Sequence, residues 1–179
     1  PQQWTELAQT LSTKQALVFF DFAYQGLAKG LEEDAAGLRE FCSQGCELLV
    51  SSSFSKNFGL YRERTGALTL VAKTAENAAT SMSILKQIIR ANYSNPPSHG
   101  AAIVTTILGD DALRQEWETE VTEMRARIAD MRIQFVEKSK ALGVTRDFSF
   151  IITQNGMFSF SGLNPEQVKQ LKDEYAIYI

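Results

Sequence analysis

The sequence has few of the residues that build metal sites. Its 179 residues include one histidine, His99, and two cysteines, Cys42 and Cys46. The cysteines are four positions apart, but a zinc site needs about two further ligands, and the histidine is far away in the sequence. We therefore expect no bound metal, and we expect both cysteines to be free thiols in a reducing compartment.

Long apolar runs are also missing. No stretch reaches the roughly 20 apolar residues that a transmembrane helix requires. The first residues, PQQWTELAQTL, lack the charged and then apolar layout of a signal peptide. We expect a cytoplasmic protein that does not bind membranes.

Basic charge is scarce as well. Lysine and arginine number 18 against 21 acidic residues, for a formal net charge of −3 and an isoelectric point near 5.3. Such a chain has no broad positive field to attract nucleic acid, so nucleic-acid binding is not expected and any anion site must be local. The hydrophobic content of 44% with 22% charged residues is typical of a globular protein with a buried core.

The first third of the chain predicts an α/β layer. The nearly continuous apolar run ALVFFDFAY (residues 16–24) is typical of a strand covered on both faces of a parallel sheet. A helix is predicted over residues 30–44 and a second strand over 47–52, and this alternation favours a largely parallel sheet. A third strand at 67–72 follows the second too closely for a crossover helix, which indicates one antiparallel member.

Helices are predicted at the N-terminus and over much of the middle of the chain. Apolar residues at helical spacing indicate a first helix over Trp4–Leu17. Thr74 can cap a helix that ends at SNPPSHG, where two prolines and a glycine break it. Another helix is predicted over 101–108, and the longest runs from about 110 to 142. At about 1.5 Å per residue the longest would span roughly 50 Å, which suits a link between two domains.

The C-terminal part predicts the beginning of a small α+β domain. The segments FSFIITQ (148–154) and MFSFSGL (157–163) flank Asn155-Gly156, a strong hairpin signal, and are expected to be strands. Asn164 and Pro165 are expected to start a helix. The last residues, EYAIYI, are expected to form a strand. The chain starts at Pro1 and not at methionine, so we expect an internal piece of a longer protein.

The segment between the second and third strands, SSSFSKNFGLYRERTG, gathers anion-binding groups around one amine. Ser53, Ser55 and Arg64 offer two hydroxyls and a forked cation close to Lys56, which suits a phosphate monoester. An amine beside a phosphate site could hold a phosphorylated aldehyde as a Schiff base. A loop lysine is more commonly a solvated charge, and the residues by themselves leave both interpretations open.

Asp21 and Tyr24, at the end of the first strand, also have two interpretations. An acid at the end of a buried strand commonly forms a salt bridge or caps a helix. It could instead hold a protonated ring nitrogen, keeping a pyridinium charged so that it accepts electrons. Tyr24 is either a half-buried aromatic side chain or a phenol offered to an oxygen of the same ring.

Three long motifs carry a resemblance to a known family. FDFAYQGLAKGLEEDAAGLR, SSSFSKNFGLYRERTG and IRANYSNPPSHGA, together with NGMFSFSGL near the end, resemble the aspartate/aromatic aminotransferases, pyridoxal 5′-phosphate enzymes of fold type I. The similarity runs through essentially the whole chain. It implies three parts: residues 1–109 from the cofactor-binding large domain, 110–143 as a long linking helix, and 144–179 as the beginning of a small domain.

The resemblance implies a role for each matching residue. Lys56 would bind the cofactor covalently and move a proton, Asp21 would pair with the pyridine nitrogen, and Tyr24 would pair with the 3′-oxygen. The phosphate would be held by Ser53, Ser55 and Arg64.

The resemblance also implies a homodimer. Arg90 would reach into the neighbouring subunit and bind the side-chain carboxylate of a dicarboxylic substrate. Ser94 and Asn95 would lie at the same interface, near the partner's cofactor phosphate. From its position alone, Arg90 could equally be an ordinary surface residue near a helix C-terminus.

The implied reaction is transamination between a dicarboxylic amino acid, aspartate or glutamate, and a 2-oxo acid. Two alternatives remain: an aromatic amino-acid aminotransferase of the same family, or a chain too incomplete for activity. The family's glycine-containing phosphate turn, stacked aromatic, ring-facing asparagine and second substrate arginine have no match here. Arg62 and Thr65 also stand where the family commonly has other residues.

Overall fold

The computed structural model of the chain describes residues 2–14 and 16–179. It forms two compact units, one ending at Ala126 and the other beginning at Arg127. The boundary falls inside the long helix α6 (Asp111–Ala141). The predicted domain boundaries, after residue 109 and after residue 143, stay a prediction.

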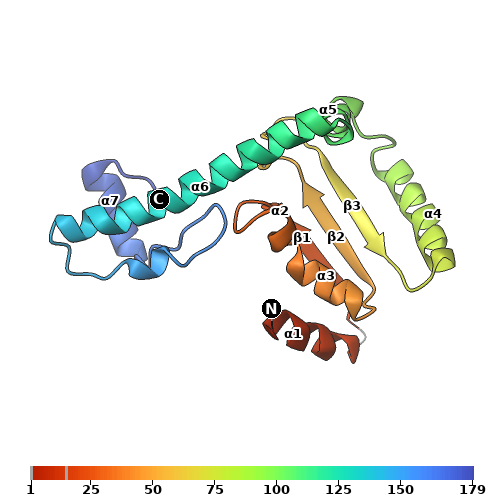
Figure 1. Cartoon of the computed structure of the whole chain (residues 1–179), viewed down its shortest axis with the longest axis horizontal. Helices are drawn as coiled ribbons and strands as arrows, with labels where there is room; N and C mark the ends of the chain where they lie inside the picture. Colours follow the sequence, from red (N-terminus) through yellow and green to blue (C-terminus); the bar gives the residue numbers. More distant parts are fainter. Residues whose placement is uncertain (1, 15) are drawn as a thin grey trace. The chain divides into compact units, whose positions relative to one another are not determined.

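A three-stranded sheet forms the centre of the first unit (Figure 1). Its strands are β1 (Val18–Phe22), β2 (Leu48–Ser53) and β3 (Gly66–Val71), in that order. β1 and β2 are parallel, and β2 and β3 are antiparallel. The predicted parallel pair and antiparallel third strand are confirmed.

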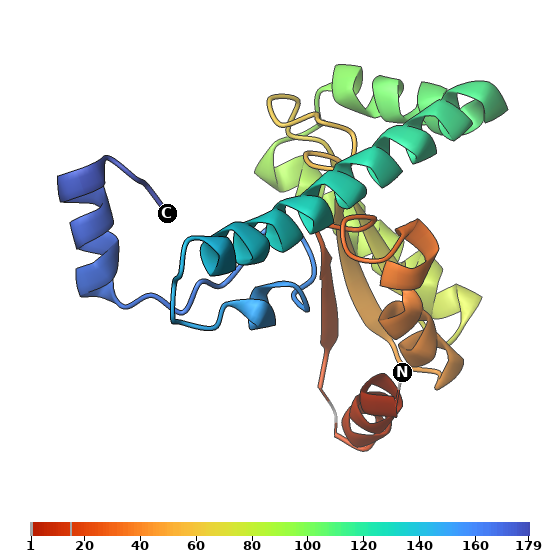
Figure 2. The same ribbon diagram turned by 60° about the vertical axis from the view of Figure 1, so that its left-hand side comes forward.

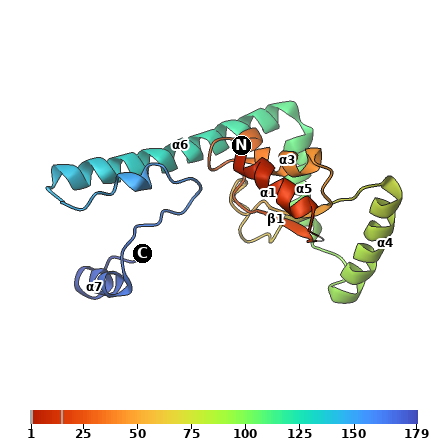
Figure 3. The same ribbon diagram turned by 90° about the horizontal axis from the view of Figure 1, so that it is seen from below.

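Two helices cover one face of this sheet. α1 (Gln2–Ser12) and α3 (Ala36–Ser43) lie beside each other in Figure 3. Their buried residues Ala8 and Phe41 join Leu48 and Val50 in the main core cluster. Phe20 of β1 meets Phe41 edge-on, with ring centroids 5.1 Å apart. An aromatic contact of this geometry adds about 0.5–1.5 kcal/mol to the burial of its area.

The helix predicted over 30–44 is two helices. α2 (Leu31–Asp34) is separated from α3 by the single residue Ala35. The Asp34 carboxylate accepts backbone N–H groups of the preceding loop, at Gly26, Ala28 and Lys29. These bonds hold α2 against that loop.

The first predicted helix is too long at its C-terminal end. The structure ends α1 at Ser12, whereas the apolar spacing predicted Leu17. Leu17 is 72% exposed, so the burial that would extend the helix is absent there. Gln15, which the prediction included, lies outside the described residues.

The other face of the sheet is open, contrary to the expectation for residues 16–24. Phe19 of β1 is 58% exposed and Leu68 of β3 is 50% exposed. Phe19 and Asp21 alternate with the core residues Val18, Phe20 and Phe22, so they lie on the face away from α1 and α3. An apolar run therefore did not mean burial on both faces here.

Helices α4 (Ala75–Asn92) and α5 (Ser98–Gly109) follow β3, and Figure 1 shows α4 to the right of β3, running back up towards α5. The predicted cap is confirmed, because the Thr74 side chain accepts a hydrogen bond from the N–H of Asn77. α5 begins directly after Pro97, three residues earlier than predicted. Among the described residues of α4, none is buried.

The long helix α6 is confirmed with both of its predicted ends. Asp110 Oδ1 accepts hydrogen bonds from the N–H groups of Ala112 and Leu113 at its start. Gly143, just beyond its end, has a φ of +75°, a conformation that glycine adopts without strain.

The second unit contains the end of α6, drawn in cyan in Figure 2, and then a 3₁₀ turn η1 (Ser149–Ile151) and helix α7 (Pro165–Tyr175), drawn in blue. The start of α7 is confirmed, since Asn164 and Gln167 form a capping box and Pro165 is the first helical residue. The Asp147 carboxylate accepts hydrogen bonds from the backbone N–H and the hydroxyl of Ser149, which lowers the pKa of that carboxyl.

The predicted strands of this unit are wrong. Within the described part of the chain, residues 148–163 form no strand, and residues 176–179 are irregular after a left-handed Ala176. The guanidinium of Arg132 of α6 competes with the first of these, because it takes the Gln154 carbonyl that would close the hairpin turn, together with the carbonyls of Gly156 and Phe158. An isolated two-stranded hairpin is marginal in water, so a buried guanidinium competes with it easily.

Candidate active site

The loops that follow β1 and β2 bring Lys56 and Tyr24 together. β1 and β2 are parallel, so their carboxyl ends meet at one edge of the sheet. Tyr24 lies two residues after β1, and Lys56 lies three residues after β2. The Nζ atom of Lys56 is 4.7 Å from the centroid of the Tyr24 ring, a cation–π contact. Two side chains 32 positions apart thus share one site.

Asp21 lies at the same edge. It pairs in register with Ser51 of β2, one residue before the end of β1. Its side chain is exposed, and Oδ1 accepts the N–H of Ala23 at 3.1 Å. The structure therefore places the carboxylate beside the Tyr24 turn, on the open face of the sheet, and not in a buried ion pair.

The serines of the Lys56 loop are adjacent to each other. Ser53 Oγ accepts the N–H of Ser55 at 3.2 Å, and Ser55 is only 5% exposed. Arg64 is exposed and donates from Nη1 to the carbonyl of Tyr61. Its φ of +50° is uncommon for a residue with a side chain and costs of order 1 kcal/mol. Backbone strain of this kind is found at ligand sites, so Arg64 stays a candidate anion ligand.

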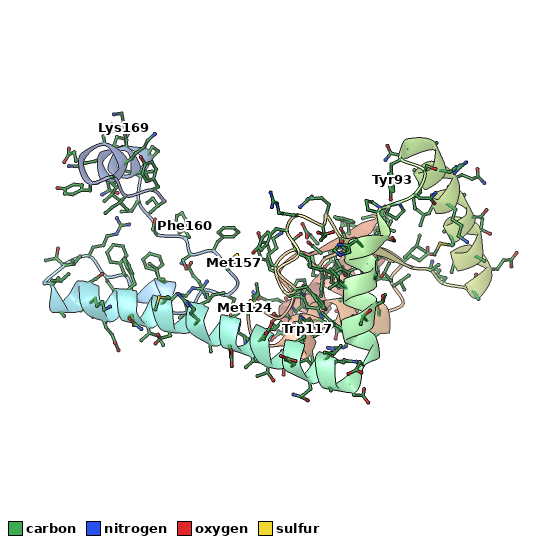
Figure 4. The ribbon with its side chains drawn as sticks, turned by 90° about the horizontal axis from the view of Figure 1, so that it is seen from above. Tyr93, Trp117, Met124, Met157, Phe160 and Lys169 are labelled. Carbon is green, nitrogen blue, oxygen red and sulfur yellow. The ribbon has the colours of Figure 1, made fainter. Side chains whose placement is uncertain are left out.

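Arg90 and Ser94 contact each other at the end of α4. Arg90 Nη1 donates to Ser94 Oγ at 2.7 Å, and Ser94 has a φ of +68°. Asn95 follows, and its N–H donates to the carbonyl of Tyr93, which Figure 4 labels at this end of the helix. Their position at a subunit interface stays a prediction.

Asn57 and Trp117 belong to the site and were missed from the sequence. Trp117 Nε1, on α6 (labelled in Figure 4), donates to the Asn57 carbonyl at 2.7 Å. The Trp117 ring also stacks on Phe58, with centroids 4.4 Å apart. The residue types around Asn57 and Trp117 carry no signal that predicts a contact 60 positions away.

Helix α5 packs against the loop that carries Arg64. His99 Nδ1 lies 2.9 Å from Glu63 Oε2. A Cβ added to Gly100 would lie 1.9 Å from Thr65 Oγ1 and 2.8 Å from Glu63 Cβ. The helix can approach this closely only because residue 100 is glycine.

The Gly100→Ala variant is expected to lower the free energy of unfolding by about 1–3 kcal/mol, because the added methyl overlaps Thr65 and Glu63. Urea unfolding followed by circular dichroism measures the change. Gly109→Ala is the matched control: it lies in the same helix with no atom within 4 Å of its added Cβ, and it should be neutral or slightly stabilising. Equal effects of the two substitutions would contradict the packing argument.

In the part of the chain that the structure describes, no group of three or more histidine, cysteine, aspartate or glutamate side chains could hold a metal ion. No helix there combines the length and apolar character needed to cross a membrane.

Comparison with known proteins identifies the family. The fold is that of the fold type I pyridoxal-phosphate transferases, as predicted. The chain belongs to the aminotransferase class I and II family, whose model matches residues 1–179.

Relatives are similar over almost all of this chain. It is 63% identical to an aspartate aminotransferase of Haemophilus influenzae and 59% identical to one of Escherichia coli, over 99% of its length in both cases. Among solved structures, an aromatic-amino-acid aminotransferase from Burkholderia pseudomallei, covalently bound to pyridoxal phosphate, has a TM-score of 0.96 and 47% identity over 99% of this chain. The chain spans 45% of each of the two aspartate aminotransferases and 44% of the Burkholderia chain.

Proposed function

We propose that this chain is part of an enzyme that transfers the amino group of aspartate or glutamate to a 2-oxo acid with pyridoxal 5′-phosphate. One observation carries the proposal: Lys56 Nζ lies 4.7 Å from the Tyr24 ring, at the carboxyl edge of the sheet. The 63% identity to an aspartate aminotransferase supports the dicarboxylic substrate.

The residues at this edge fit the cofactor by their chemistry. The cofactor has an aldehyde, a ring nitrogen, a ring oxygen and a phosphate. At the ends of two adjacent strands and in the loops that follow them, the site offers an amine, a carboxylate, a phenol and hydroxyls, from Lys56, Asp21, Tyr24, Ser53 and Ser55. When bound, pyridoxal phosphate supplies an electron sink that stabilises negative charge at the α-carbon of the substrate.

Each side chain would then have a separate task. Lys56 Nζ would form the covalent link to the aldehyde and, once displaced by the substrate amine, would take the proton from the α-carbon. The Asp21 carboxylate would keep a proton on the ring nitrogen. Ser53, Ser55 and Arg64 would hold the phosphate, with the Arg64 guanidinium turning from the Tyr61 carbonyl towards it.

A second copy of the chain would supply the substrate-side residues. In a homodimer, Arg90 would bind the side-chain carboxylate of the substrate in the partner's site, with Ser94 and Asn95 at the interface. The exposed apolar residues of α4 support such an interface, since Met82, Ile84 and Ile88 are each at least 50% exposed. A monomer in sedimentation velocity would contradict it.

Two alternatives have support of their own. An aromatic amino-acid aminotransferase is supported by the Burkholderia structure and by 42% identity to a tyrosine aminotransferase of Klebsiella pneumoniae. A chain without activity is supported by its covering less than half of its relatives. Location in the cytoplasm also stays a prediction, and one relative, from Oryza sativa, is named a cytoplasmic enzyme.

The test is an absorbance titration of the full chain with pyridoxal 5′-phosphate, followed by addition of amino donors. We expect a visible band that borohydride removes, leaving a label on the peptide containing Lys56. Aspartate and glutamate should convert this band faster than tyrosine, whereas faster conversion by tyrosine would support the aromatic alternative. A chain that gains no band would support the inactive alternative.

A further inference from the structure

Asn57, the residue after Lys56, is a buried polar residue with an unusual environment. It is 5% exposed. Its side-chain oxygen, Oδ1, is buried, and within the described residues 2–14 and 16–179 no group donates a hydrogen bond to it. Burying a polar atom unpaired is unfavourable, and native proteins contain few such atoms. The reason for an asparagine at this position must therefore be sought in what the other half of its amide contacts.

The other half of the amide connects two loops. Asn57 Nδ2 donates to the carbonyl of Gln25 at 3.2 Å. Gln25 directly follows Tyr24, and Asn57 directly follows Lys56. The amide therefore bridges the two loops one residue away from the pair formed by Lys56 and Tyr24.

The part of α6 that belongs to the first unit makes a hydrogen bond to each of the same two loops. Trp117 Nε1 donates to the Asn57 carbonyl at 2.7 Å, and Arg125 Nη1 donates to the Gly26 carbonyl at 3.0 Å. Trp117 and Arg125 are eight positions apart on one helix, so both loops are fastened to a single rigid element. Asn57 is the residue that contacts both the helix and the opposite loop.

We propose that Asn57 is a positioning residue. Its side-chain amide fixes the positions of the two loops relative to each other, so that the Lys56 amine stays over the Tyr24 ring. The proposal rests on the proposed function for the chemical use of Lys56. A positioning role also explains the unpaired Oδ1. The Nδ2 donor is needed to reach the Gln25 carbonyl, and a side-chain amide always carries an oxygen together with that donor.

The test measures the reactivity of individual lysines in the full chain. Trace acetylation with acetic anhydride, followed by mass spectrometry of peptides, gives the rate at Lys56 relative to Lys86, an exposed lysine of α4. In Asn57→Leu, which keeps a similar volume, we expect this ratio to rise about two- to fivefold, because the amine leaves the ring and becomes solvated. Thermal unfolding should change little, because removal of the unpaired oxygen offsets the loss of the hydrogen bond to the Gln25 carbonyl.

A double-substitution cycle separates positioning from a general structural effect. Tyr24→Leu should raise the same ratio, and adding Asn57→Leu to it should give no further rise, because both substitutions break one contact. An unchanged ratio in folded Asn57→Leu, or fully additive effects, would overturn the proposal.

A second variant keeps the proposal testable if Asn57→Leu does not fold. Trp117→Phe keeps an aromatic ring against Phe58 but removes the Nε1 donor to Asn57, and a smaller rise in the Lys56 ratio is expected. No rise in this variant would also overturn the proposal. Because acetylation uses no cofactor, a wild-type chain that fails to bind pyridoxal phosphate would contradict the proposed function without affecting this measurement.

Discussion

Replacing Lys56 with alanine is expected to remove the borohydride-stable pyridoxal phosphate label from its peptide, with a loss of at least about 100-fold in cofactor-dependent amino transfer. The alanine has no amine to form the link or to take the proton from the substrate. Peptide mapping after reduction measures the first effect, and single-turnover absorbance with aspartate measures the second.

Two control variants distinguish the need for the Lys56 amine from the need for a positive charge or for lysines in general. Lys56→Arg keeps a cation over the Tyr24 ring but offers a guanidinium that stays protonated, so it should behave like alanine. Lys86→Ala removes an exposed lysine of α4 and should leave the labelling unchanged. Label that persists at the wild-type level in Lys56→Ala would show that other lysines bind the aldehyde, and the proposed role would be wrong.

Replacing Arg132 with methionine is expected to lower the stability of the second unit by about 3 kcal/mol. Arg132 is 7% exposed, and its guanidinium donates to the carbonyls of Gln154, Gly156 and Phe158 and to Ser159 Oγ. Methionine fills a similar volume but donates nothing, so three backbone carbonyls lose a donor, at about 1 kcal/mol each. The loop carrying Met157 and Phe160, labelled in Figure 4, should lose its fixed conformation.

Hydrogen exchange of peptides covering residues 149–160 measures this loss, because local opening is reported there directly. Arg127→Met is the matched control, since Arg127 lies on the same helix but is exposed. It should change stability by no more than about 0.5 kcal/mol. Unchanged protection of the loop in Arg132→Met would contradict the stabilising role of the arginine.

Elements with local signals were predictable from the sequence. Thr74, Asp110 and Asn164 each start a helix where predicted, because a capping side chain satisfies N–H groups only two or three residues away. The antiparallel third strand followed from the short connection after β2. The chemistry of the Lys56 loop was also visible, because its serines, arginine and amine are close in sequence.

Features that depend on distant contacts were not predictable. The hairpin expected around Asn155-Gly156 does not form, and Arg132, 22 positions before Gln154, takes the Gln154 carbonyl that would close its turn. The run containing Phe19 is open on one face, because burial depends on which elements pack on the sheet and not on the strand itself.

The sequence by itself determined the three strands of the sheet, the long helices of the middle of the chain, the caps that start several helices and the residue types at the candidate site. The tertiary structure alone decided that Lys56 lies over Tyr24, that Asn57 joins their loops and that α6 anchors both. The physical reason is the distance along the sequence over which each kind of interaction acts. Propensities and caps act over about one helical turn, whereas these contacts join residues 32 to 99 positions apart and exist only after the chain has packed.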